Sequence, residues 1–239
     1  MSDIKYRLPA DIERASMEII RSELTARKII LDPVHEPIIL RVIHTTADFD
    51  YAKTLTFTPG AVERGISALA AGADIVTDTN MARAGISKPA LAKLGGELFC
   101  YMADPEVAAA AKSEGVTRAA VSMRKAAQEH PDAILAVGNA PTALLELCAL
   151  MENGLRPPLV IGVPVGFVNV IESKRRLLEL CRRCGVPAVV ALGRKGGSNV
   201  AAAICNALLS PFWIRCPLTG AFTHCLSAAS CTASAAARH

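Results

Sequence analysis

The stretch that decides the fold is "AILAVGNAPTALLELCALMENG", residues 133–154. It opens with a short apolar run, turns at Gly138, and continues after Pro141 with apolar residues at helical spacing. A strand that leads directly into a helix is the repeating unit of a parallel sheet. The polar and small residues at the turn, "GNAPT", either only start the helix or also hold a ligand.

The same alternation of strand and helix patterns recurs from residue 54 onward. The strand patterns lie within residues 54–58, 73–79, 97–102, 133–138, 158–166 and 187–192. They are continuous apolar runs, which is typical of strands that are covered on both faces. The sequence therefore predicts a single α/β domain with a mostly parallel central sheet and helices on both faces.

Two further helices are expected before this alternating region, at residues 8–24 and 35–48. The first is expected to pack through one apolar face, made of Ile12, Ala15, Ile19 and Ile20. The last thirty residues differ, because they have no clear period and hold the only tryptophan of the chain. We therefore predict a domain over residues 1–209 and a poorly ordered tail over 210–239.

Composition excludes several classes of protein. The chain has 239 residues, of which 51% are hydrophobic, and a net charge of only +4. This charge is too small to suggest nucleic-acid binding, although it favours a small polyanion. No apolar run reaches the roughly 20 residues of a membrane span, and no secretory signal is visible. We predict a cytoplasmic protein that binds neither nucleic acid nor membrane.

The eight cysteines do not predict a disulfide framework, because most of them fall within apolar helix or strand patterns. Cys181 and Cys184 form a C-x-x-C at the end of a basic helix. No second pair stands nearby at the spacing of a zinc site. We therefore predict no metal.

Four junctions between a strand and the following helix carry unusual residues. They are "VTDTN" (76–80), "VGNAPT" (137–142), "GVPVGF" (162–167) and "GRKGGSN" (193–199). The carboxyl ends of parallel strands meet at one edge of a sheet, where glycine amides and helix starts favour anions. Arg194 and Lys195 add positive charge there. Any one junction is explained by a turn and a cap, but together they predict a site for a ligand with several carboxylates or phosphates.

Nucleotide cofactors are not predicted, because the chain has neither a P-loop nor a G-x-G-x-x-G after its first strand. His44 is the strongest candidate for a catalytic residue. A lone histidine is often structural, yet the spacing of Ile38, Ile39, Val42 and Ile43 places it nearly opposite their apolar stripe. An exposed histidine can deliver a proton near neutral pH. Asp48 or Asp50, in the loop that follows, could orient its imidazole.

Arg118 is expected near the start of a helix, where a cation opposes the helix dipole. It is interpreted either as a surface charge or as a clamp on a carboxylate. Ser16, taken alone, is most simply an exposed residue of the first helix.

Four segments, in this order and spacing, resemble the precorrin-8X methylmutase family of cobalamin biosynthesis. They are "RVIHTTADFDY", "GNAPTALLEL", "GVPVGFVNVIESK" and "GRKGGSNVAAAICNAL". The resemblance covers about residues 9–209, and "IHTTADFDYAK" is more similar to the cobalt-precorrin-8 enzymes than to the cobalt-free ones. The residues that follow depart from the family pattern.

The resemblance implies an isomerase that moves a methyl group from C-11 to C-12 of the corrin ring, giving cobyrinate or hydrogenobyrinate. It implies no cofactor, a tetrapyrrole as substrate, and a homodimer with its sites near the subunit interface. His44 matches the family histidine that protonates the macrocycle. The candidate substrate contacts carried over by motif are Ser16, Arg118, Asn139, Thr142, Gly166, Gly196, Gly197 and Ser198.

On this view the segment Gly138–Thr142 starts a helix and holds an acetate or propionate arm of the ligand. Two alternatives stay open. A corrinoid-binding carrier would bind the ring without converting it, and an unrelated α/β enzyme would act on a small phosphorylated substrate.

Overall fold

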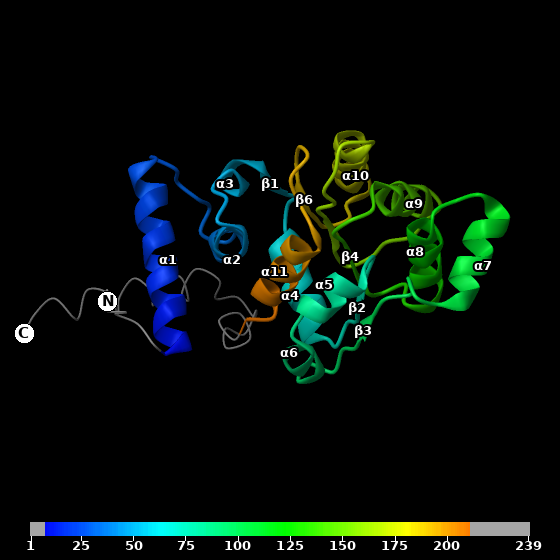
Figure 1. Ribbon diagram of the computed structural model, residues 1–239, viewed down its shortest axis with the longest axis horizontal. Helices are drawn as coiled ribbons and strands as arrows, with labels where there is room; N and C mark the ends of the chain where they lie inside the picture. Colours follow the sequence, from blue (N-terminus) through cyan, green and yellow to red (C-terminus); the bar gives the residue numbers. More distant parts are fainter. Residues whose placement is uncertain (1–7, 211–239) are drawn as a thin grey trace, which may run out of the picture.

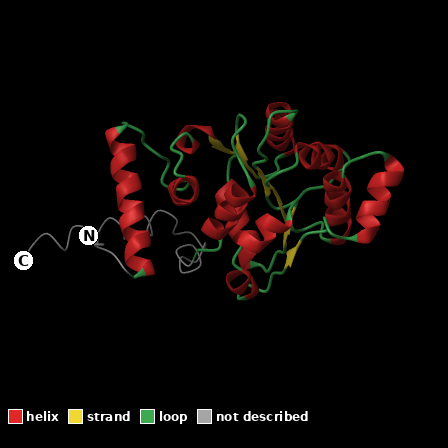
Figure 2. Ribbon diagram, viewed as in Figure 1, coloured by secondary structure: helices red, strands yellow, loops and turns green. Residues whose placement is uncertain are grey.

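The computed structural model describes residues 8–210, in which a six-stranded sheet has helices on both of its faces (Figures 1 and 2). The strands are β1 (Leu55–Phe57), β2 (Ile75–Thr77), β3 (Leu98–Phe99), β4 (Ile134–Val137), β5 (Val160–Gly162) and β6 (Ala188–Ala191). Their order is β1-β6-β5-β4-β2-β3. Only β1 pairs antiparallel, with β6, and the other pairs are parallel. The predicted α/β class is confirmed.

The helices mostly follow the predicted alternation. They are α1 (Pro9–Ala26), α2 (Glu36–Thr46), α3 (Tyr51–Thr54), α4 (Ala61–Ala70), α5 (Asn80–Gly85), α6 (Lys88–Ala92), α7 (Pro105–Glu114), α8 (Arg118–Glu129), α9 (Pro141–Glu152), α10 (Val170–Cys184) and α11 (Ser198–Leu208). The segment after β2 forms two short helices, because Ile86 and Ser87 are extended. Within residues 8–210, no helix combines the length and apolar character needed to cross a membrane.

Strand residues alternate between two core layers, as the twofold period of a strand requires. In β4, Ile134 and Ala136 belong to the layer with α4 and α11, whereas Leu135 and Val137 belong to the layer with α8, α9 and α10. Figure 1 shows these two groups of helices on opposite sides of the sheet. All four β4 residues are fully buried. This burial on both faces explains the continuous apolar run from which the parallel sheet was predicted.

Helix α1 lies at the margin of the molecule and packs mainly on α2 (Figure 1). Its buried contacts come from Ile20 and Leu24, while Ile12 is 46% and Ile19 is 59% exposed. Of the predicted packing face, Ile20 is buried as expected, and the prediction was wrong for Ile12 and Ile19. The helix buries only a narrow stripe, and its one extensive contact within the described residues is with α2.

The predicted poorly ordered tail at residues 210–239 lies, apart from Ser210, outside the described residues. The last described helix, α11, ends at Leu208. Its side chains fill the space between α2 and α5 and complete the core on that face of the sheet.

Candidate active site

The four junctions converge at one edge of the sheet. They follow β2, β4, β5 and β6, which are neighbouring parallel strands, so their carboxyl ends lie side by side. Hydrogen bonds join them directly. The hydroxyls of Thr79 and Ser198 are 2.7 Å apart, and the amide of Gly197 donates to the carbonyl of Val163 at 2.9 Å. The expected convergence is confirmed.

Two glycines let the backbones of these junctions approach one another. A Cβ at Gly138 would lie 2.7 Å from the Cα of Ser198. A Cβ at Gly196 would lie 2.1 Å from the carbonyl oxygen of Val163 and 2.6 Å from that of Pro164. Because backbone atoms cannot rotate away as a side chain can, neither position accepts a larger residue without displacing a loop.

We expect Gly196→Ala to lower the free energy of unfolding by about 1 to 3 kcal/mol, because the new methyl group overlaps two carbonyls. Gly115→Ala is a comparison with the opposite character, since Gly115 has φ of 68° but nothing within 4 Å of its Cβ position. Because Gly196 has no positive φ, urea unfolding of both variants compares the cost of the overlap at Gly196 with the cost of left-handed backbone at Gly115. A loss below about 0.5 kcal/mol for Gly196→Ala would contradict the packing described here.

Asp78 directly follows β2, and its side chain lies at the turn between β4 and α9. Its side chain is fully buried, and its two carboxylate oxygens accept the amides of Gly138, Asn139 and Ala140 at 2.7, 2.8 and 2.8 Å. Burial raises the pKa of Asp78, while the three amide donors act against that shift. Helix α9 has no side-chain cap of its own, because Ala140 stands at the N-cap position. Asp78 instead accepts the amides of the N-cap residue and of the two residues before it, so it fixes the turn that leads into the helix.

This contact narrows one expectation. The segment Gly138–Thr142 was expected to hold an acidic arm of the ligand, but Asp78 accepts three of its amides, those of Gly138, Asn139 and Ala140. Pro141 has no amide hydrogen, so a ligand at this junction is left with the amide of Thr142 and with side chains. Asn139 is exposed, and the hydroxyl of Thr142 lies 2.7 Å from that of Thr117.

Thr117 connects Arg118 to the same edge. Thr117 is the N-cap of α8, where its hydroxyl accepts the amide of Ala120. The same hydroxyl contacts Thr142 in α9, so Arg118, the first residue of α8, lies beside the start of α9. Arg118 is exposed and forms no hydrogen bond or ion pair within residues 8–210. It is therefore a free cation at the edge where anions are expected.

His44 lies in the last turn of α2, as predicted, on the side away from the buried stripe. Val42 and Ile43 are buried, whereas His44 is exposed. Among the described residues its imidazole has no hydrogen-bond or ion-pair partner. A histidine held in the core would need such a partner. The structural alternative, a satisfied core histidine, is thus excluded, and the ring is free to meet a ligand.

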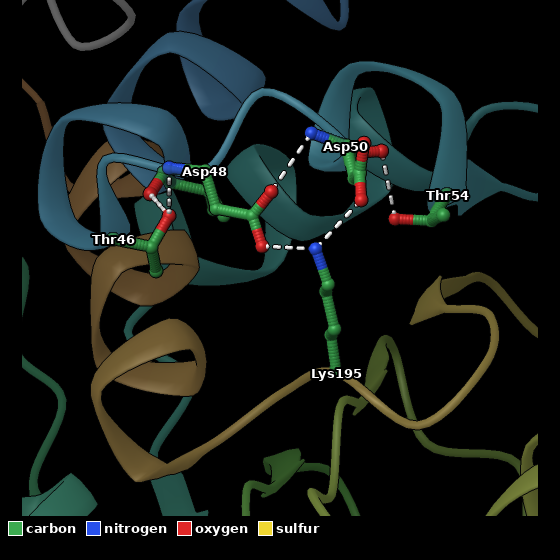
Figure 3. Close-up of polar contacts among 6 residues, drawn as sticks. Thr46, Asp48, Asp50, Thr54 and Lys195 are labelled. Atoms are coloured by element: carbon green, nitrogen blue, oxygen red, sulfur yellow. Dashed lines mark hydrogen bonds and ion pairs between the residues drawn. The ribbon is translucent and has the colours of Figure 1, made fainter.

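The aspartates after His44 have a different partner from the one expected. The Nζ atom of Lys195 lies 2.6 Å from a carboxylate oxygen of Asp48 and 2.6 Å from one of Asp50 (Figure 3). Neither carboxylate is hydrogen-bonded to His44, so the expectation that one of them orients the imidazole directly was wrong. Lys195, expected to attract the ligand, instead has its charge balanced by these two carboxylates.

Lys174 is a fully buried cation beside the loop between β6 and α11, which carries Lys195. Its Nζ atom donates to the carbonyls of Gly193 at 2.9 Å and Lys195 at 2.8 Å. Burial lowers the pKa of Lys174 to about 8. The ammonium group ties α10 to the loop that follows β6, and so it sets the path of the residues that lead to Gly196 and Gly197.

Lys174 makes stability depend on pH in a predictable direction. Its pKa is lowered from 10.5 to about 8 on folding, so the unfolded chain binds more protons between these values. The cost of burying the charge is fully present below pH 8 and is relieved as the pH rises toward 10.5. We expect wild type to gain up to about 3 kcal/mol relative to Lys174→Met over this window. Urea unfolding at pH 7, 8, 9 and 10 measures it, and a constant difference would contradict the prediction.

The loop after β5 presents apolar residues beside Arg194. The amide of Gly166 donates to the carbonyl of Arg194 at 3.3 Å, and the guanidinium of Arg194 lies 5.5 Å from the centre of the Phe167 ring. Phe167 is 83% exposed. The junctions after β5 and β6 therefore form one continuous surface, with a flat aromatic ring and a cation exposed on it.

Ser16 is the one candidate that a single chain does not bring to this edge. Its hydroxyl donates to the carbonyl of Ile12 within α1 at 2.7 Å. Helix α1 packs on α2 at the margin of the molecule and forms no extensive contact with the strand–helix junctions.

A pocket of about 530 Å³ lies at the opposite edge of the sheet, before β2 and β4. Asp74 and His130 line it, with 2.9 Å between Oδ2 and Nδ1. It contains none of the glycine junctions, so we do not assign the chemistry to it. Cys181 is buried in α10, and burial raises its pKa to about 12, which makes it a poor nucleophile.

Comparison with known proteins identifies the family. Residues 11–211 match the family described as precorrin-8X methylmutase. The chain belongs to this family. A cobalt-precorrin-8 methylmutase of Salmonella typhimurium is 47% identical over 205 residues, covering 84% of this chain and 94% of that protein. One of Priestia megaterium is 44% identical over 201 residues, covering 84% of this chain and 87% of the other.

A solved structure agrees with the family. The precorrin-8X methylmutase of Thermus thermophilus superposes with a TM-score of 0.74 at 42% identity, covering 83% of this chain and 95% of that one. The resemblance found in four sequence segments is thereby confirmed, and with it the prediction of a methylmutase-family enzyme.

Proposed function

We propose that this chain catalyses the migration of a methyl group from C-11 to C-12 of cobalt-precorrin-8 or precorrin-8, with His44 as the proton donor. The bond from the methyl group to C-11 breaks as its bond to C-12 forms. Proton loss from the ring balances the proton that His44 delivers, so substrate and product are isomers. Neither a methyl donor nor a redox reagent enters this balance.

The observation that carries the proposal is the state of His44. Its imidazole is exposed and unpaired among the described residues, and Lys195 connects the end of its helix to the glycine junctions. A proton donor must be able to reach the bound substrate without first breaking a hydrogen bond to the protein. The absence of a nucleophile with an adjacent base in the described site agrees with a rearrangement that needs an acid and a shaped surface.

The acidic arms of the ring would meet the other candidates. Arg118 is unpaired among the described residues and can form a bidentate contact with a carboxylate. The side chains of Asn139 and Thr142 stand at the start of α9, and Gly166, Gly196, Gly197 and Ser198 line the two neighbouring junctions. Of these, Gly197 and Ser198 are buried, so their contribution is to shape the surface more than to touch the ligand.

A homodimer is proposed from the free face of α1. Ile12, Ser16 and Ile19 share one face of this helix because they are separated by four and three residues. Ile12 and Ile19 are largely exposed, and Leu8 extends the same face. A second copy covering this face would bury the apolar side chains and bring Ser16 next to the partner. Sedimentation of wild type and of Ile12→Glu with Ile19→Glu would test this, because the charged pair is expected to yield monomers.

The proposed reaction is tested by mixing the wild-type protein with cobalt-precorrin-8 and, separately, with precorrin-8. We expect the absorbance of the corrin chromophore to appear while the mass of the ligand stays unchanged. The similarity to the two cobalt-precorrin-8 relatives favours faster conversion of the cobalt substrate. Binding without a spectral change would make the protein a carrier. The prediction of a cytoplasmic protein stays a prediction, which cell fractionation would test.

A further inference from the structure

The link between His44 and the glycine junctions passes through Lys195. Asp48 follows His44 by four residues and Asp50 stands at the N-cap position of α3, so both belong to the segment that leaves α2. Lys195 comes from the loop between β6 and α11. Figure 3 shows its side chain reaching across to the two carboxylates. This contact joins segments almost 150 residues apart in the chain.

The segment on the aspartate side is braced internally. The amide of Asp50 donates to Asp48 at 3.0 Å, and the amide of Asp48 donates to the hydroxyl of Thr46 at 3.3 Å. That hydroxyl in turn donates to the carbonyl of Val42, inside α2, at 2.8 Å. Because these bonds connect the carboxylates to the last turn of the helix, a shift of Asp48 is transmitted to the turn that carries His44.

The lysine side is braced as well. The backbone carbonyl of Lys195 accepts a hydrogen bond from the buried ammonium of Lys174. The next residue, Gly196, is packed against the carbonyls of Val163 and Pro164 with no room for a side chain. The backbone of Lys195 is thus fixed by the Lys174 hydrogen bond and by the packing of Gly196. Its side chain can therefore hold the loop after α2 in place.

The charge balance at this contact distinguishes two roles for Lys195, which are to attract an acidic arm of the ligand and to hold the loop after α2 in place. One ammonium faces two carboxylates, so the group carries a net negative charge when all three are ionised. Hydrogen bonding to Lys195 lowers the pKa of Asp48, so its carboxylate stays ionised at neutral pH. A cation balanced in this way offers little attraction to an acidic ligand arm.

We propose that Lys195 is a positioning residue, which holds the end of α2 against the glycine junctions through Asp48 and Asp50 and thereby sets where His44 meets the substrate. This inference rests on the proposed role of His44. The contact is partly exposed, so its contribution to stability is small. Its effect lies in geometry, where a displacement of about 1 Å can change a rate about 100-fold.

The test compares Lys195→Met with Asp48→Asn and Asp50→Asn made together, in the full chain. Either change removes the contact, so each should lower kcat about 10- to 100-fold with less than about a threefold change in KM. A variant that carries all three substitutions should have a kcat no lower than that of either variant alone, because both changes break the same contact. Lys195→Arg should restore part of the rate. Lys53→Met, an exposed lysine of α3, is the matched control and should behave as wild type.

Two results would overturn the proposal. An increase in KM for Lys195→Met with kcat unchanged would make Lys195 a direct contact of the substrate. Additive losses in the combined variant would show that the lysine and the aspartates act separately. Combining Lys195→Met with His44→Ala adds a further test, because a residue that acts through His44 has no additional effect once His44 is gone. Failure of wild type to convert substrate would instead refute the proposed function, so the two failures are distinct.

Discussion

His44→Ala is expected to lower kcat about 100- to 10,000-fold, which is the usual contribution of a positioned proton donor. The KM for the tetrapyrrole should change little, because the groups proposed to hold its acidic arms are retained. The fold should be retained too, since the imidazole is exposed and unpaired among the described residues. Steady-state absorbance kinetics with cobalt-precorrin-8 measure both constants.

Thr45→Ala serves as the control, because Thr45 is the exposed neighbour of His44 and its hydroxyl, within residues 8–210, bonds only to the carbonyl of Arg41 in α2. It should retain the wild-type rate. His44→Gln keeps the size of the side chain without its acidity and should be as slow as His44→Ala. Wild-type kcat in His44→Gln would mean that the side chain shapes the site without donating a proton.

Asp78→Ala is expected to lower the free energy of unfolding by at least about 3 kcal/mol, since it leaves three amides without their acceptor. Loss of an N-cap alone costs about 1 kcal/mol, but this carboxylate is fully buried and accepts three bonds. For a chain of this size the melting temperature should fall by roughly 6 to 12 °C. Calorimetry at neutral pH measures this fall.

Asp132→Ala is the comparison for that loss, because Asp132 is exposed and has no described hydrogen bond or ion pair. It should change the melting temperature by no more than about 2 °C. If Asp78→Ala and Asp132→Ala were equally stable, the amides of Gly138, Asn139 and Ala140 would have to bond to another group or be open to a ligand after all.

Local pattern was sufficient to predict the fold. Continuous apolar strands that alternate with helices required a covered parallel sheet, and the sheet is observed. The face of α1 was predicted only in part, because helical periodicity reports which residues could be buried, not whether a partner is present. Ile12 and Ile19 fit the pattern yet remain exposed in one chain. The antiparallel pairing of β1 was also beyond what an isolated strand pattern can specify.

The parts of the candidate site that could be predicted are those whose place follows from the position of a residue in a strand–helix unit or on a helix face. The junctions had to converge, and His44 had to point away from the apolar stripe of α2. The contacts of Asp78 and Lys195 were missed, because each joins residues at least 60 positions apart and has no local signature. Lys174 did leave a signal, since its spacing from Val170 and Leu177 places it on the apolar face of α10.

The most direct test of the central claim uses His44→Ala mixed with an equal amount of cobalt-precorrin-8, followed by a trace of the wild-type protein. The absorbance spectrum of the first mixture should show bound, unconverted substrate. After the wild-type protein is added, the spectrum should change to that of the corrin product with no change in ligand mass. Conversion by His44→Ala alone at the wild-type rate, or no conversion after wild type is added, would contradict a methylmutase that uses His44 as its acid.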